Sequence, residues 1–246
     1  MNWKKDLREK DDAVSPVIAL MLILAILATC LAVYTTTYVP GLKQQDEITH
    51  SGEVKLAFER FASDIDNVIA LGKPAVYTEV LELGGGDVPL SPTKSSGTVE
   101  INTSKIGTYQ INSGSEQDLN GIEISYLPSF TAWEKQGYLY KNGVVWITKD
   151  EKKTPAQLTL YTVVDGEDRE NEILAKWYPA SPTEGIVIPN FSVVEGKSEI
   201  TGTSTAKLRL NATLGDDLSS VIVTLNDGTS RIYTNARLLN IEVSVE

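Results

Sequence analysis

AVSPVIALMLILAILATCLAVYTTTYVPGL, residues 13–42, contains no Asp, Glu, Lys or Arg, whereas charged residues lie close on both sides. About 20 apolar residues cross a bilayer as a helix, and the apolar core of a cleaved secretory signal is shorter, at about 7 to 15. A helix from Ser15 to Val39 would measure about 37 Å at about 1.5 Å per residue. The stretch can therefore span a membrane, with Thr35–Tyr38 in the headgroup zone.

Composition limits the rest of the chain. It has 246 residues, one His, one Cys and a net charge of -11. The part after the apolar stretch is long enough for one domain with its own core or for two small ones. Cys30 is the single Cys, so no internal disulfide can form. It lies in the apolar stretch, where it acts either as a small apolar residue or as a lipidation site. The acidic balance argues against nucleic acid as a partner, because phosphate binding needs clustered Lys and Arg.

The charges around the apolar stretch predict its orientation. Lys4, Lys5, Arg8 and Lys10 precede it, and Lys43 stands alone just after it. Lys and Arg concentrate on the cytoplasmic side of membrane helices. We therefore expect a cytoplasmic N-terminus and a single-pass anchor with the large domain outside.

The start of the apolar stretch has the residues of a helix start. Ser15 is a good N-cap, and Pro16 at the first helical position loses no hydrogen bond, because its missing N–H would have been unpaired there. The sequence predicts a helix that begins at this point.

The same residues resemble a known processing site. Asp12-Ala13-Val14-Ser15 is similar to an archaeal class III signal peptide, and the run at 13–18, AVSPVI, resembles the start of archaeal type IV pilin-like proteins. The resemblance implies cleavage between Ala13 and Val14 by a prepilin-peptidase-like enzyme, which leaves the apolar helix on the product. The fifth mature residue would be Ile18, where bacterial pilins carry Glu. The alternative is a signal-anchor helix that is never cut.

A neck and a second helix follow. Pro40-Gly41 should break or bend the first helix. Apolar residues then recur at steps of three and four between Ser51 and Leu71, which predicts an amphipathic helix capped by Ser51 and ended by Gly72. The pilin resemblance implies that this helix packs on the head. His50 is the only His, which nearly excludes a His-based metal site or catalytic dyad, and we expect it to make a hydrogen bond in the neck.

Short alternating runs replace helical periodicity from residue 74 onward, and we expect a strand at each of them. The expected strands are Val76–Leu83, Thr98–Ile101, Gly121–Tyr126, Tyr138–Tyr140, Val144–Thr148, Gln157–Val164, Gly185–Pro189, Ala206–Asn211, Ser219–Leu225, Arg231–Tyr233 and Leu238–Val245. Turn residues between them favour a mostly antiparallel, β-sandwich-like head, which makes the fold class α+β.

Two hairpins are explicit in the sequence. Asn142-Gly143 suits a type I′ turn and would place Leu139 opposite Trp146 and Tyr140 opposite Val145. A second hairpin, from Val223 to Tyr233, should turn at residues 226–228.

Several motifs resemble sites that carry chemistry. Leu83–Leu90 is rich in Gly but lacks the spacing of a phosphate-binding loop. The acidic run Asp165–Glu172 is either a solvated turn or an ion site, and it lacks the spacing of an EF-hand. No nucleophile and base motif is present, and Asp216-Asp217 does not establish a pair of catalytic carboxylates. The sequence predicts no enzyme, no cofactor and no metal.

Three sequons occur in the domain that we expect outside the cell. They begin at Asn102, Asn190 and Asn211, and each is a candidate for N-glycosylation, although sequons also arise by chance.

The sequence thus divides into a signal peptide (1–13), a transmembrane and assembly helix (14–40), a neck with an amphipathic helix (41–73) and an extracellular β-rich head (74–246). The pilin resemblance, which covers Asp12 to Trp146, implies a structural subunit that self-associates through its N-terminal helix into a type IV-like filament. The alternative is a monomeric membrane-anchored adhesion domain that binds glycan or protein through Trp133, Tyr138 and Tyr140. An extracellular hydrolase is a third class, for which no residue stands out.

Overall fold

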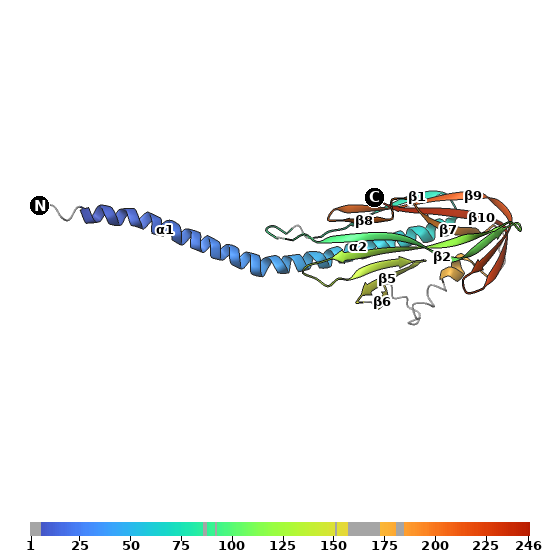
Figure 1. Cartoon of the computed structure of the whole chain (residues 1–246), viewed down its shortest axis with the longest axis horizontal. Helices are drawn as coiled ribbons and strands as arrows, with labels where there is room; N and C mark the ends of the chain where they lie inside the picture. The colour runs from blue at the N-terminus through green and yellow to red at the C-terminus, as the bar shows by residue number, and fades with distance from the viewer. Residues whose placement is uncertain (1–5, 86–87, 92, 151, 157–172, 181–184) are drawn as a thin grey trace.

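The computed structural model describes residues 6–85, 88–91, 93–150, 152–156, 173–180 and 185–246, and it describes side chains from Pro16 onward. A long N-terminal helix projects from a β-rich head, so the protein is elongated (Figure 1). The apolar helix followed by a large, mostly antiparallel sheet confirms the α+β class.

The helix is longer than predicted at its start. It consists of α1 (Asp6–Val33), a π-helical turn η1 (Tyr34–Tyr38) and α2 (Val39–Leu71). The prediction that Ser15 caps the helix is wrong for the uncut chain, since Pro16 lies inside α1. Residues 6–12 are mostly good helix formers, and an interior Pro removes only one backbone hydrogen bond, so the helix extends past it.

Pro40 bends the helix without ending it. It has no N–H to donate to Thr36 O, four residues back, and its ring crowds that carbonyl. The preceding turn widens, and the Val39 N–H bonds to Tyr34 O, five residues back. Figure 1 shows the change of direction where α1 gives way to α2. The bend predicted at Pro40-Gly41 is confirmed, but the second helix begins at Val39.

One face of α2 forms the centre of the core. Val54, Phe58, Phe61, Ile65 and Val68 are each no more than 1% exposed and recur at steps of three and four. The helix ends where the sequence predicted, because Gly72 adopts a left-handed conformation (φ 57°) and its N–H bonds to Val68 O.

The head contains ten described strands and a short helical segment at 173–177. The strands are β1 (Ala75–Glu82), β2 (Ser96–Ile111), β3 (Glu116–Ser129), β4 (Gly137–Lys141), β5 (Val144–Lys149), β6 (Lys152–Pro155), β7 (Val187–Val193), β8 (Glu199–Gly202), β9 (Thr205–Leu225) and β10 (Ser230–Val245). Side chains alternate between core and solvent along them, as in β9, where buried Leu208 and Leu210 flank exposed Arg209.

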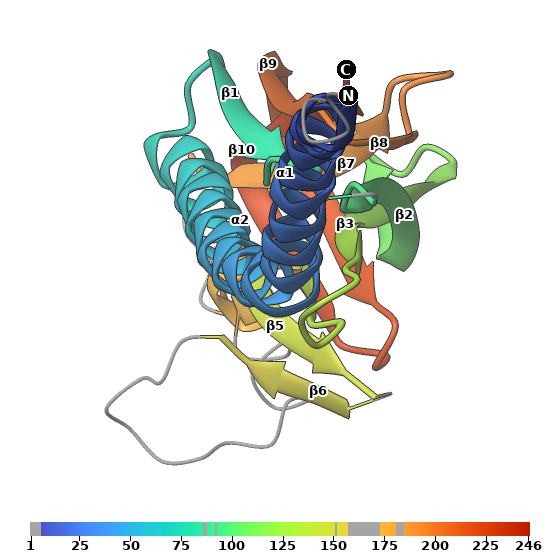
Figure 2. The ribbon, with the colours of Figure 1, turned by 90° about the vertical axis from the view of Figure 1, so that its left-hand side faces the viewer.

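The described strands form one hydrogen-bonded sheet, in the order β6-β5-β4-β3-β2-β9-β10-β7, with β1 added to β9 and β8 added to β2. Two separate sheets, as in a sandwich, are not found in the described part of the chain. The strands β6-β5-β4-β3-β2 are joined to β9-β10-β7 where Gly107–Ile111 of β2 pairs with Val221–Leu225 of β9. All described pairings are antiparallel except β7 with β10. The sheet curls around α2, with β1 and β5 on different sides of the helix (Figure 2).

Both predicted hairpins are confirmed. Leu139 lies opposite Trp146 and Tyr140 opposite Val145, with left-handed Asn142 and Gly143 at the turn. Strands β9 and β10 also pair as a hairpin. Each of them, however, is one long strand where the sequence predicted two. The expected strand at 157–164 lies outside the described residues.

Candidate functional site

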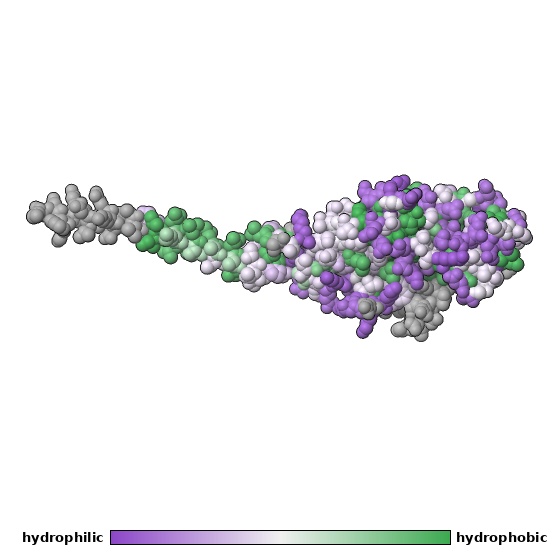
Figure 3. Space-filling model, viewed as in Figure 1, coloured by the Kyte–Doolittle hydropathy of each residue, from purple (hydrophilic) through white to green (hydrophobic). Residues whose placement is uncertain are grey.

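The apolar half of the helix is an extended surface without a partner in the described part of the chain. From Val17 to Val33 its large apolar side chains are 51–65% exposed, on every side of α1. Figure 3 shows this segment as a continuous hydrophobic rod that contrasts with the mixed surface of the head. The helix is long and apolar enough to cross a membrane, and no part of its most apolar window is buried. Such a surface needs cover by lipid or by other apolar helices.

Four buried polar side chains join the helix to the near end of the head. We call Lys43, Glu47, His50 and Ser51 the neck cluster; each is at most 6% exposed. They lie on one face of α2, in line with Val54 and the core residues beyond it. Because buried polar groups need partners, the head must supply them.

The head does supply partners for the two ends of the neck cluster. The Lys43 ammonium donates to the backbone carbonyl and the hydroxyl of Thr93, at 2.6 and 2.7 Å. The Ser51 hydroxyl lies 2.8 Å from the hydroxyl of Tyr138, which also accepts a bond from Gln136. Ser51 therefore holds the helix to strand β4 and does not cap a helix start as predicted.

Glu47 is the most completely buried member, with no exposed surface. Its carboxylate accepts hydrogen bonds from the Ser95 hydroxyl, from the N–H and hydroxyl of Thr131 (3.0 and 3.3 Å) and from the N–H of Ala132 (2.8 Å). Burial by itself would raise the pKa of Glu47, but these bonds, with one from the Trp133 N–H, outweigh it and hold the pKa below its usual value. The carboxylate is thus ionised and fastens the 130–133 loop to α2.

His50 makes the predicted hydrogen bond in the neck. Its Nε2 lies 2.9 Å from the Tyr126 hydroxyl, which donates to Leu83 O at 3.3 Å. Since that hydroxyl proton goes to the carbonyl, the network assigns the imidazole proton to Nε2. Burial lowers the pKa of His50, although the carboxylates of Glu82, Glu53, Asp46 and Glu47 oppose the shift.

A polar cavity of about 380 Å³ lies beside His50, and we call it the neck cavity. One ring nitrogen of His50 and one carboxylate oxygen each of Glu53 and Glu82 lie within 4.8 Å of one another there. Asp46 and Lys94 also line it. The described residues therefore bring a metal-ligand set together that the sequence, with its single His, did not predict.

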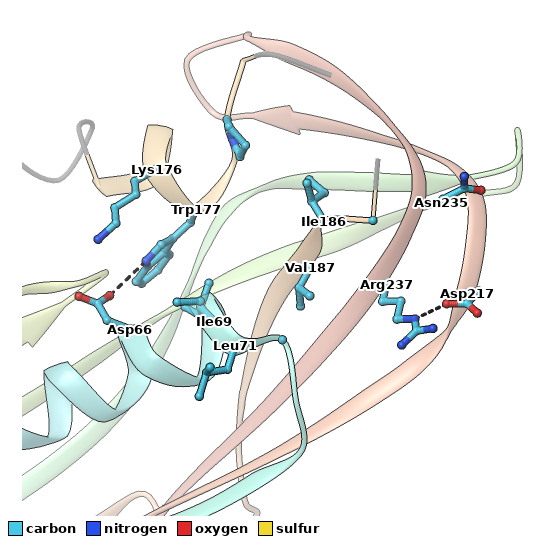
Figure 4. Close-up of a pocket in the computed structure, with 14 residues that line it drawn as sticks. Asp66, Ile69, Leu71, Lys176, Trp177, Ile186, Val187, Asp217, Asn235 and Arg237 are labelled. Atoms are coloured by element: carbon cyan, nitrogen blue, oxygen red, sulfur yellow. Dashed lines mark hydrogen bonds and ion pairs between the residues drawn. The ribbon is translucent and has the colours of Figure 1, made fainter. Parts of the chain in front are cut away.

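A second cavity, of about 740 Å³, lies at the end of the head that is farthest from α1. Figure 4 shows its walls: the end of α2 with Ile69, the short helical segment with Trp177, and the β9–β10 hairpin with Asp217 and Arg237. The Trp177 indole N–H donates to Asp66 at 3.4 Å, and Arg237 pairs with Asp217. The cavity has both apolar and charged walls, and its size suits a small molecule.

The predicted modification sites fall in different surroundings. Ala13 and Val14 lie within the backbone of α1. Asn102 is exposed on β2, where its amide bonds to Glu100, whereas the half-buried Asn190 accepts a bond from the backbone of β3. Asn211 on β9 is also half-buried. Cleavage and glycosylation stay predictions.

The aromatic residues expected to bind a ligand are mostly in the core. Tyr138 and Tyr140 are 2% and 0% exposed, and only Trp133 is partly exposed. The helix α2 covers both tyrosines, because Phe58 packs on Tyr138 and Phe61 packs on Tyr140, so neither is available to bind a ligand. The acidic run 165–172 lies outside the described residues.

Sequence reasoning missed Lys43, Glu47 and Ser51. Their hydropathy is that of a solvent-facing surface, but their spacing is that of the buried stripe: residues 43, 47, 50 or 51, 54, 58, 61, 65 and 68 follow one another at steps of three or four. A register continued backward from Val54 would have placed them inside.

Comparison of the chain with models of protein families, with curated proteins and with solved structures found no match.

Proposed function

We propose that the protein is a structural, membrane-anchored surface protein, an archaeal type IV pilin-like subunit or pseudopilin whose N-terminal helix first anchors and then assembles it. One observation carries the proposal: a single helix is exposed and apolar on all sides from Val17 to Val33 and has one face buried in the head along α2. A helix of this kind presents the head at a fixed position on whatever covers its apolar half.

Lipid and neighbouring copies are both suitable covers. Small residues recur along the apolar half, at Ala19, Ala25, Ala28 and Ala32. Small residues let helix backbones approach closely in an apolar medium, where packing drives association. The same surface can therefore lie in a bilayer and afterwards pack with copies of itself.

Processing at Ala13/Val14 fits this role, because the cut removes the charged N-terminal residues and keeps the helix. Pro16 would then be the third residue, in the first turn, where a missing N–H has no cost. With the charged segment gone, the apolar end could enter a helix bundle.

N-terminal sequencing of the protein from its native membranes tests the processing step. A start at Val14 supports the proposal, while an intact Met1 or a start beyond Tyr34 contradicts it. An Ala13→Gly variant should still be cut, and Ala13→Leu should stay uncut yet reach the membrane.

Filament purification from the native cells tests assembly. The chain should be present in sheared filaments, and Ala28→Leu should reduce its share there by blocking close helix contact. The matched variant Ile26→Leu, which keeps the volume, should not. Absence of the chain from filaments would refute the assembly role and leave the anchor.

The alternative is a monomeric anchored domain that binds a ligand. Its binding site would then be the cavity beside Trp177, because Tyr138 and Tyr140 are buried. A chain that stays monomeric in mild detergent and binds a glycan or a protein would support this alternative. Trp177→Phe, which removes the indole N–H, should then weaken that binding.

A further inference from the structure

Side chains that can coordinate a metal ion line the neck cavity from two elements, α2 and β1. Asp46, His50 and Glu53 are spaced by four and three residues, so they share one face of α2. Glu82 ends strand β1 and faces them. Gly85 lies against His50 and Asp46: a Cβ added to it would be 2.9 Å from His50 Cβ and 3.3 Å from Asp46 Oδ2. The backbone there thus approaches the cluster as closely as a residue without a side chain allows.

His50 offers an unused lone pair. Its side chain is 97% buried, and its Nε2–H is committed to Tyr126, which leaves Nδ1 unprotonated. Neither Nδ1 nor the buried Asp46 Oδ2 has a hydrogen-bond partner in the described part of the chain. A buried acceptor without a donor is unfavourable, so both atoms are suited to bind a cation.

We propose that the neck cavity binds one divalent transition-metal ion, through His50 Nδ1 and carboxylate oxygens of Glu53 and Glu82, with Asp46 beside them on the cavity wall. An imidazole nitrogen with carboxylates suits Zn²⁺ or Mn²⁺, whereas Ca²⁺ takes six to eight oxygens. The Nε2–H bond to Tyr126 is the kind of support that orients metal-bound imidazoles. The inference does not depend on the proposed function.

A bound ion would tie α2 to the end of β1, next to the contacts of the neck cluster. Lys94 also lines the cavity and has interactions of its own.

Calorimetric titration tests the site. The full-length chain in detergent micelles is stripped with a chelator, transferred to chelator-free buffer and titrated with ZnCl₂, then with MnCl₂ in a separate run. We expect one ion per chain. Glu53→Gln and Glu82→Gln should each weaken binding about tenfold or more, since each removes a ligand. Both carboxylates are exposed, so neither change disturbs the core.

Glu195→Gln is the matched control, because it removes the same charge from an exposed position outside the cavity. It should bind as the unchanged chain does. No one-to-one binding by the unchanged chain would overturn the proposal. So would equal affinities for all variants, or an equal loss in Glu195→Gln, which would indicate attraction by the overall negative charge alone.

Discussion

Replacing Glu47 by Ala should detach the 130–133 loop from α2. Besides weaker contacts, the carboxylate accepts bonds from the Ser95 hydroxyl and from the backbone N–H groups of Thr131 and Ala132, and hydrogen bonds to a charged group contribute about 1.5–3 kcal/mol each. Thr131 is exposed, so water can replace part of the loss. We expect the free energy of unfolding of the head to fall by about 3 kcal/mol, a large share of the 5–15 kcal/mol that is typical of a domain.

Urea unfolding of the full-length chain in micelles, followed by Trp fluorescence, measures this change. Amide hydrogen exchange at Thr131 and Ala132 should accelerate in the same variant. Glu47→Gln should lose about half as much, near 1.5 kcal/mol, because one acceptor oxygen survives. Glu53→Gln in metal-free buffer is the control and should change stability by less than about 0.5 kcal/mol. An Ala variant as stable as the original, with unchanged exchange at both amides, would refute the role given to Glu47.

Three further predictions concern the head. Glu47 and His50 both have a folded-state pKa below the unfolded value, so each stabilises the fold fully above the unfolded pKa and less as pH falls. Tm should therefore drop below about pH 6.5, where His50 begins to titrate in the unfolded chain, and again below about pH 4.5, where Glu47 does. A flat Tm profile down to pH 4 would contradict this. Phe58→Ala should cost about 3–5 kcal/mol in urea unfolding, against less than about 1 kcal/mol for the exposed Leu56→Ala, and equal losses would place the core elsewhere. Gly143→Ala should cost about 2 kcal/mol or more by thermal unfolding, since Gly143 has φ +93° and the new Cβ would lie 2.5 Å from an Ile side chain; a neutral result would mean that the hairpin shifts freely.

Local patterns in the sequence predict those parts of the fold that depend on interactions between neighbouring residues. Asn142-Gly143 specifies a tight turn, and the turn specifies the register of the flanking strands, so Leu139 and Trp146 could be paired in advance. Gly72 ends α2 for an equally local reason, its left-handed conformation.

Contacts between distant residues could not be read in this way. The sheet is continuous because Gly107–Ile111 pairs with Val221–Leu225, more than 100 residues later, and nothing near either segment indicates that partner. The same holds for β9, predicted as two strands, which runs through Gly215 and two Asp residues because β10 supplies a partner on both sides of that point. Glu47 looks like a solvent-exposed residue until the donors of the 130–133 loop are known.

The burial of α2 along its length also determines how the protein would bear a pull. A force applied to an anchored or assembled α1 would enter the head along the axis of α2, and the long strands run in nearly the same direction (Figure 1). If another point of the head were held, such a load would shear the hydrogen bonds between strands together and would not open them one at a time. The neck cluster and the apolar stripe, residues 43–68, would share the same load along about 38 Å of helix, at about 1.5 Å per residue. This arrangement would resist extension along the helix axis.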